Sequence, residues 1–348
     1  MAGVSSPAVA APPPVPGIRR RLALTLLGYG ALAAGVCLLA PTIGSTPISL
    51  GRVFDRSVPF ADNVDAQIFF IARLPRVLAG ALVGSTLAAA GVVLQALLRN
   101  PLATPFTLGV SAGAALGAML AIAFPAGLAV WGLSSVPIAS FAGSLGAAAI
   151  VYALARGRRR GLSTNVLLLA GVTLNAFFSA LILFVQYLAD FSETYRTVRW
   201  LMGDLDVAGY TLIAAAVPFA GTAFVMFAWL PRALNLLTLG PDAAAGRGVD
   251  LARTQRAAFF SASLATGAAV SIGGPIGFIG IVVPHLVRLL VGSDHRLVLP
   301  ASALFGAAFL VACDLAARTV MAPMELPVGI VTAIIGGPFF LWLLIRRS

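Results

Sequence analysis

The sequence predicts an all-α polytopic membrane protein with about ten transmembrane helices. Hydrophobic residues make up 59% of the 348 residues, charged residues only 10%, and the mean hydropathy is +0.98. Soluble domains carry roughly 25% charged residues, so lipid must be the solvent for much of this apolar surface. The apolar residues also fall into ten runs that can cross a bilayer, since about 20 helical residues span its roughly 30 Å core.

The first run extends from Leu22 to Ala40, directly after three consecutive arginines. A basic segment before an apolar run is also typical of a signal peptide, but this run of 19 residues is long enough to span the membrane. We therefore expect a retained first helix. The other nine helices are expected at 74–98, 105–123, 136–155, 165–188, 209–230, 256–272, 276–291, 298–317 and 327–345.

The chain is expected to form one membrane domain behind a short tail. Residues 1–18 are rich in Pro and Ala and carry no charged side chain, so we expect a disordered cytoplasmic tail. Residues 19–348 then form a single transmembrane domain. Glycines recur within it four residues apart, a spacing that favours close helix packing in lipid, as in the pairs Gly80/Gly84, Gly109/Gly113, Gly113/Gly117 and Gly273/Gly277.

The basic residues orient the chain in the membrane. Arginine supplies all 23 of them, and the net charge is +11. A cytoplasmic N-terminus and ten spans put both termini in the cytoplasm, with sixteen arginines on inner segments and seven on outer segments. This distribution follows the positive-inside rule and argues against nucleic-acid binding. The sequence has no lysine, which excludes a P-loop ATPase because its Walker A motif requires one.

Three blocks of sequence carry more specific information. The first contains Arg73–Arg76 (RLPR), Asn100–Ala103 (NPLA) and Leu108–Ala114 (LGVSAGA). The second contains Gly274–Gly280 (GPIGFIG), Pro284–Arg288 (PHLVR) and Gly292–Arg296 (GSDHR). The third contains Asp314, Arg318, Glu325–Gly329 (ELPVG) and Gly336–Phe340 (GGPFF). With these blocks the chain resembles, over roughly residues 68–347, the permeases of the iron-siderophore, haem and cobalamin ABC importers.

This resemblance implies a fold and a set of partners. The fold is that of a type II ABC importer permease, which is a membrane subunit and not an enzyme. The implied partners are a second permease subunit (a homodimer is expected and a heterodimer stays open), two cytoplasmic ATPase subunits, a periplasmic substrate-binding protein and membrane lipid. The expected location is the cell inner membrane, and no cofactor or metal site is expected.

Docking of the binding protein is implied for Arg73, Arg76 and Arg318. Arg73 and Arg76 are three residues apart and so lie on one face of a helix. At the start of a helix they would not offset its dipole, so another anion is expected, and in the resembling family it is a carboxylate of the binding protein. Anchoring to lipid phosphates is the alternative.

A polar segment at about 232–252 resembles the coupling helices that dock on the ATPase subunit. The residues implied in this contact are Leu237, Leu239, Gly240, Asp242, Ala243 and Ala244. The sequence departs from the family pattern at Ala245–Arg247, where Gly246 weakens a helix by about 1 kcal/mol. A simple cytoplasmic loop is the alternative.

A cytoplasmic gate is implied at two places, Asn100 with Leu102 and Thr164 with Asn165. The nearby prolines Pro101 and Pro105 break the helix, and helix-start prolines without a gating role are the alternative. His285 and His295 are interpreted as structural, with His295 in a polar loop.

The cargo is argued partly from what the spans lack. A path for bare metal ions would need carboxylates, histidines or methionines in the spans, which contain almost none. A chelate brings its own ligands, so an iron chelate is expected, with an iron(III)-siderophore first and haem or cobalamin as alternatives. A secondary transporter is the alternative of another class, and it would need an intramembrane ionisable relay.

Overall fold

The computed structural model describes residues 17–124, 134–156, 162–207 and 209–347, and these residues are almost entirely helical, without a β-strand. The expected tail lies mostly outside the described residues, since α1 already begins at Ile18. The main helices are α1 (Ile18–Leu39), α4 (Leu74–Leu98), α5 (Val110–Ala123), α6 (Ser135–Ala155), α7 (Thr164–Leu188), α9 (Thr211–Trp229), α12 (Leu251–Gly273), α13 (Ile279–Val291), α14 (His295–Thr319) and α15 (Val328–Arg347).

Each of the ten expected spans is a helix in the structure. Six helical stretches are long and apolar enough to cross a membrane, and α5, α13 and α15 contain shorter apolar stretches. α12, with 23 residues, is the remaining helix of the ten expected spans. Short elements lie between them, namely η1 (Ala40–Thr42), α2 (Leu50–Val53), α3 (Val64–Gln67), η2 (Ile68–Arg73), η3 (Phe106–Leu108), α8 (Phe191–Leu201), α10 (Pro231–Leu237) and α11 (Pro241–Ala245).

The second span begins earlier than expected. The helix continues back from α4 through the π-helical turn η2 and α3, so the helical stretch runs from Val64 to Leu98. Arg73 and Arg76 therefore lie inside a long helix, and the expectation that they occupy its first turn is wrong. Short π-helical segments occur frequently at functional sites, and this one ends at Arg73.

Two other helices start later than expected because of positive backbone dihedrals. Gly109 has φ +75° and separates the turn η3 from α5, so α5 begins at Val110. Phe278 has φ +67° and delays α13 to Ile279. His295, expected in a loop, is the first residue of α14, because Asp294 caps that helix by accepting a hydrogen bond from the Arg296 N–H.

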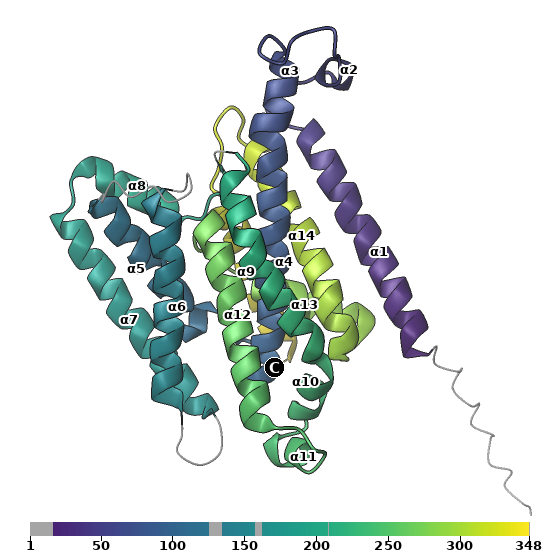
Figure 1. Cartoon of the computed structure of the whole chain (residues 1–348), viewed down its shortest axis with the longest axis vertical. Coiled ribbons are helices and arrows are strands. Elements are labelled where there is room, and N and C mark those ends of the chain that lie inside the picture. The colour runs from purple at the N-terminus through teal and green to yellow at the C-terminus, as the bar shows by residue number, and fades with distance from the viewer. Residues whose placement is uncertain (1–16, 125–133, 157–161, 208, 348) are drawn as a thin grey trace, which may run out of the picture.

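α4 lies at the centre of the helical bundle and contacts α14, α12, α13 and α9 (Figure 1). Glycines allow the closest contacts. A Cβ on Gly84 would overlap the carbonyl of Gly306 in α14, and one on Gly91 would overlap the backbone of Gly280 in α13. α5, α6 and α7 form a second group beside this core, where Gly113 packs against Gly143. Of the predicted glycine contacts, Gly277 makes none, since a Cβ there would meet open space.

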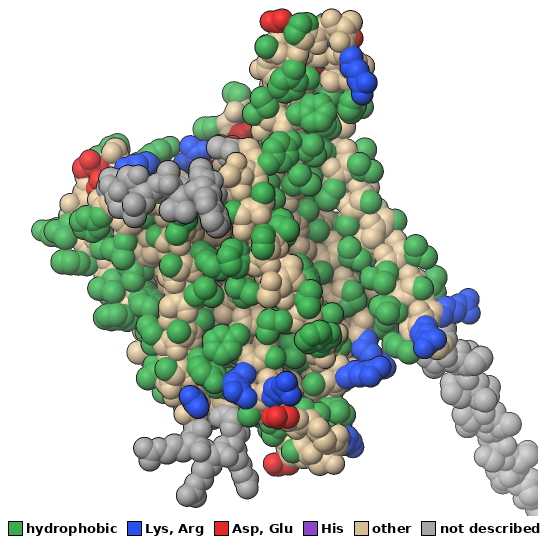
Figure 2. Space-filling view, viewed as in Figure 1, with side chains coloured by type: hydrophobic (Ala, Val, Ile, Leu, Met, Phe, Trp, Pro, Cys, Tyr) green, Lys and Arg blue, Asp and Glu red, His purple; other side chains and the backbone are tan. Residues whose placement is uncertain are grey.

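The molecule has two distinct ends. The short helices α2, α3 and α8 lie at one end, and α10 and α11 lie at the other (Figure 1). We call them the α8 end and the α11 end. The start of α1 and the C-terminal end of the chain both lie toward the α11 end (Figure 1). Hydrophobic side chains cover the middle of the face in Figure 2, and basic side chains gather along its α11 end.

Candidate functional site

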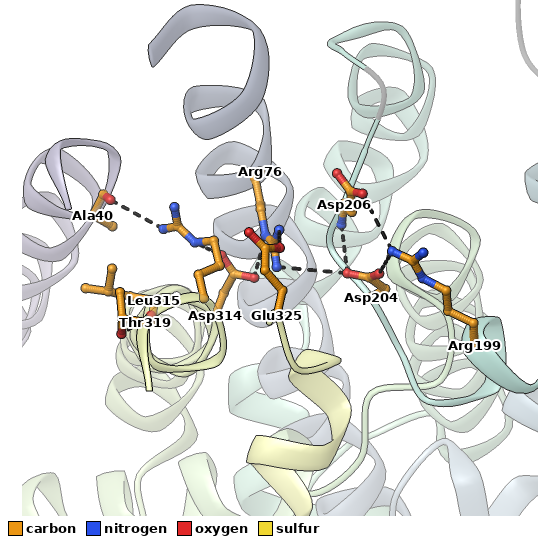
Figure 3. Close-up of polar contacts among 10 residues, drawn as sticks. Ala40, Arg76, Arg199, Asp204, Asp206, Asp314, Leu315, Thr319 and Glu325 are labelled. Atoms are coloured by element: carbon orange, nitrogen blue, oxygen red, sulfur yellow. Dashed lines mark hydrogen bonds and ion pairs between the residues drawn. The ribbon is translucent and has the colours of Figure 1, made fainter. Parts of the chain in front are cut away.

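Arg76 is the centre of a buried charge cluster at the α8 end. Its Nε donates to Asp314 Oδ1 over 2.8 Å, and its Nη1 donates to Glu325 Oε2 over 2.6 Å (Figure 3). Only 6% of the Arg76 side chain is exposed, against 2% for Asp314 and 46% for Glu325. α4, α14 and the segment before α15 are thus joined through one guanidinium group.

Arg318 shares the same buried carboxylate. Its Nε lies 3.1 Å from Asp314 Oδ2, one helical turn away, and its Nη2 donates to the Ala40 carbonyl over 3.3 Å. Asp314 therefore compensates two buried arginines at once. Since an isolated buried charge is strongly unfavourable, this carboxylate offsets the cost of burying both guanidinium groups.

Arg73 differs from the other two arginines. Although only 6% of the residue is exposed, its guanidinium donates to backbone carbonyls, those of Pro41 and Thr46, and no carboxylate pairs with it among the described residues. These carbonyls accept hydrogen bonds from the Arg73 guanidinium, but they carry no net negative charge to balance its positive charge. Arg73 is therefore a buried cation without a counter-charge of its own.

The cluster extends to α8 and the segment after it. Arg199 lies 3.4 Å from Asp204 and 3.8 Å from Asp206, and Asp204 lies 4.0 Å from Arg76 (Figure 3). We call the full set the outer charge cluster, which consists of Arg73, Arg76, Arg199, Asp204, Asp206, Asp314, Arg318 and Glu325. It holds four positive and four negative side chains and is neutral as a whole.

The three arginines expected to dock a partner are therefore brought together, but they are not exposed. Arg73, Arg76 and Arg318 have 6%, 5% and 4% of their surface exposed. They line a cavity of about 350 Å³ at the α8 end, together with Asp206 and Glu325. This cavity gives an anion a route to their guanidinium groups.

The sequence interpretation missed the acidic partners of these arginines. Asp314 is 238 residues from Arg76 along the chain and Glu325 is 249, so no local pattern joins them. One signal was available, because Asp314 and Arg318 are four residues apart within an apolar span. Asp190 and Glu193 form a capping box that starts α8.

The expected coupling segment is a pair of short helices, α10 and α11, at the α11 end. Gly240, with φ +111°, forms the turn between them. The predicted contact residues divide between two faces. Leu237 and Ala244 are buried against the bundle, while Leu239 is 62% exposed and Asp242 is also exposed. α11 ends at Ala245, where Gly246 is the C-cap.

α10 is fastened to the start of α14 by hydrogen bonds. Asn235 Nδ2 donates to Asp294 Oδ1 over 2.8 Å, and Asn235 Oδ1 accepts from the His295 N–H over 2.9 Å and lies 2.7 Å from His295 Nδ1. Asp294 also accepts from Arg296, and these donors hold its pKa well below the usual range. The segment and α14 therefore share one polar junction.

The two expected gate positions also lie at the α11 end. Asn100 follows the C-cap of α4, and its Oδ1 accepts a hydrogen bond from the Leu102 N–H over 2.9 Å, while the Leu102 side chain is exposed. Thr164 and Asn165, expected before the fifth span, are the first two residues of α7. No hydrogen bond joins these two places in the part of the chain that the structure describes.

An apolar cavity of about 610 Å³ lies beside α15. Phe106, Met202, Phe278, Ile330 and Ile334 are among its lining residues, and they come from four separate segments of the chain. Ligand pockets of this size are typically lined by apolar and aromatic side chains. Met202 follows α8 directly, so this cavity and the outer charge cluster are adjacent along that segment.

These features define a multi-pass membrane subunit with a cavity at one end and a protruding helix pair at the other. The chain belongs to the FecCD transport family, whose pattern matches residues 32–346. This family consists of permease subunits of ABC transporters, which are membrane channel components and not enzymes.

Several known proteins are similar over most of their length. The hemin transport system permease of Yersinia pestis is 40% identical over 315 residues, which is 90% of this chain and 94% of that protein. The cobalamin import system permease of Halobacterium salinarum is 45% identical over 79% of this chain and 73% of its own. The iron(3+)-hydroxamate import system permease of Bacillus subtilis is 36% identical over 92% and 84%.

A solved structure of a metal-chelate type ABC transporter in an inward-facing conformation is also similar. Its TM-score is 0.81 at 32% identity, and the match covers 93% of this chain and 99% of that chain. The type II importer fold expected from the sequence is therefore confirmed.

Proposed function

We propose that this chain is one half of the membrane channel of an ATP-driven importer for an iron chelate, with an iron(III)-siderophore as its cargo. The observation that carries the proposal is the apolar cavity of about 610 Å³ beside α15. A chelate supplies its own ligands to the metal, so it needs a wide apolar passage rather than protein ligands. Permeases for hemin, cobalamin and hydroxamate-bound iron among the relatives support a cargo of this kind.

The proposed orientation puts the α11 end in the cytoplasm, with both termini on that side. The basic side chains gathered at this end support it, because positive residues favour the cytoplasmic side (Figure 2). Residues 19–348 then form one permease domain in the inner membrane. A cysteine in place of Thr238, which is exposed, should react only from the cytoplasmic side when Cys37 and Cys313 are removed.

We further propose that the α10–α11 pair binds an ATPase subunit, with a second permease subunit completing a homodimer that binds two such subunits. The exposed side chains of Leu239 and Asp242 point to a partner surface, while the buried Leu237 and Ala244 hold the pair on the bundle. Gly240, Ala243 and the turn between the helices set the spacing of that surface. Asn100, Leu102, Thr164 and Asn165 lie at the same end and form the proposed gate.

At the other end, the proposed partner is a substrate-binding protein. Its carboxylates would enter the cavity lined by Arg73, Arg76 and Arg318. Arg73 has no carboxylate partner among the residues that the structure describes, which makes it the arginine best suited to receive one. At Arg76 an incoming carboxylate must compete with Glu325, which already accepts a hydrogen bond from that guanidinium.

Uptake by the complete transporter in proteoliposomes tests the cargo. The permease, its ATPase subunit and its binding protein are reconstituted together, and uptake of an iron(III)-siderophore, haem and cobalamin is measured with and without ATP inside. We expect uptake of the siderophore complex only when ATP is present. Uptake of haem or cobalamin instead would correct the cargo, and uptake driven by an ion gradient without ATP would overturn the importer proposal.

A further inference from the structure

A second polar cavity, of about 320 Å³, lies at the α11 end. We call it the basic cavity, because Arg99 and Arg288 line it and no carboxylate does. Its other polar lining residues are Gln95, Asn100, Thr238, Ser293 and His295. None of the sites discussed above accounts for its charge.

Arg288 is a half-buried cation with a neutral partner. Its Nη1 donates to Gln95 Oε1 over 2.6 Å, and among the described residues it forms no ion pair. Gln95 is held in this orientation because its Nε2 donates to the Gly280 carbonyl over 2.8 Å. Buried charges are normally paired, so this half-buried guanidinium is available to pair with an anion from outside the chain.

Arg99 adds a second guanidinium group that has no partner. It is the C-cap of α4, with φ +49°, and its side chain forms no hydrogen bond or ion pair with any described residue. The carboxylate nearest to Arg288 in sequence, Asp294, is already bound by Asn235 and Arg296. Both arginines therefore face the cavity with donors to spare.

We propose that the basic cavity binds a phosphate-class anion. A phosphate monoester carries a charge of about −1.5 to −2 near pH 7, which two guanidinium groups neutralise. Arginine binds phosphate oxygens through paired N–H donors, and the Asn100 amide and the Ser293 hydroxyl can supply further donors. A single carboxylate would leave one of the two positive charges uncompensated.

The anion would join two parts of the chain that are far apart in sequence. Asn100 and Pro101 belong to the turn after α4, while Thr238 is the C-cap of α10, and all three line the basic cavity. A bound anion would therefore connect the proposed gate turn to the proposed coupling helix. The binding site itself depends on neither proposal, and its test requires neither transport nor partners.

Phosphate binding is measured on the purified full-length chain in an uncharged detergent. Sodium phosphate is titrated against sodium chloride at equal ionic strength, and the thermal unfolding midpoint is followed. We expect a saturable rise with phosphate alone. Arg99→Asn should weaken the apparent affinity about tenfold to a hundredfold, the range for one lost charge-assisted hydrogen-bonding group. Asn is chosen because it tolerates the left-handed conformation of Arg99.

Two additions make the test decisive. Arg253→Asn is the matched control, because Arg253 is exposed and lies outside the cavity, and we expect it to bind phosphate like the parent. A second arm compares nanodiscs of phosphatidylcholine with nanodiscs that also contain phosphatidic acid, a lipid whose headgroup is a phosphate monoester. An Arg99-dependent shift with this lipid alone assigns the phosphate to a lipid headgroup, and a shift with free phosphate assigns it to a soluble anion. The proposal is overturned if neither probe gives an Arg99-dependent shift, or if Arg253→Asn has the same effect.

Discussion

Replacing Glu325 with Gln should strengthen docking of the substrate-binding protein. Glu325 occupies one side of the Arg76 guanidinium and lines the same cavity as the three proposed docking arginines. It therefore holds a position that a carboxylate of the partner would take. Glutamine keeps the size of the side chain but removes the negative charge, so the cavity becomes one unit more positive.

The structure sets the expected magnitude. An exposed ion pair contributes about 0.2–1 kcal/mol. The Glu325 side chain is 46% exposed but its partner is only 6% exposed, which places the pair near the upper limit. If removing this competing ion pair makes the free energy of docking more favourable by about 1 kcal/mol, the Kd of the binding protein falls roughly fivefold. The loop itself should persist, because the Leu326 N–H donates to the Ala317 carbonyl over 3.1 Å whatever side chain occupies position 325.

The assay is binding of the partner protein to the permease in nanodiscs, at two ionic strengths. Asp62→Asn is the matched control, since it removes one exposed carboxylate near the α8 end without changing this cavity. We expect a lower Kd for Glu325→Gln alone, with a difference that shrinks at high salt. If Glu325→Gln binds as the parent does, or more weakly, Glu325 does not compete for Arg76 and the cavity is not the docking site.

Three further predictions follow from the packing. Asp314→Asn should destabilise the chain by about 3–5 kcal/mol in unfolding measurements, because it leaves two buried arginines without their shared counter-charge, whereas Glu325→Gln should cost about 1 kcal/mol or less. Gly84→Ala should cost about 1–3 kcal/mol because its Cβ would overlap Gly306, and Gly277→Ala, in open space, should leave the unfolding midpoint unchanged. Leu239→Ser should weaken binding of the ATPase subunit without changing the unfolding midpoint, since that side chain is 62% exposed, and unchanged binding would exclude it from the interface.

The sequence predicted the helices well because each span carries its own signal in length and hydropathy. It failed where a single backbone dihedral determines the first residue of a helix. The positive φ angles of Gly109 and Phe278 make α5 and α13 begin later than expected. It also placed the start of the second helix too late. Asp65, Gln67 and Arg73 interrupt the apolar run before Leu74, so hydropathy did not indicate that the helix continues back to Val64.

For the candidate docking residues, the sequence indicated which side chains to consider but not their surroundings. The sequence interpretation grouped Arg73, Arg76 and Arg318 in one docking site. It did not indicate that they are buried or that Asp314 forms ion pairs with both Arg76 and Arg318. The basic cavity was missed altogether, because Arg99, Thr238 and Arg288 come from three distant segments. Such sites depend on tertiary packing, which local patterns cannot report.

α14 connects the two ends of the molecule at which partners are proposed to bind. Asp314 and Arg318, near its C-terminus, belong to the outer charge cluster, while His295, at its N-terminus, is hydrogen-bonded to Asn235 of the coupling segment. A helix of 25 residues is about 37 Å long, and the contact between Gly84 and Gly306 holds it against α4 along the way. This close contact opposes sliding of the two helices past each other. A displacement caused by docking would therefore reach α10 as a movement of α14 together with α4. Alternatively, α14 would bend at Pro300, where the helix lacks one backbone hydrogen bond, and α10 would not move.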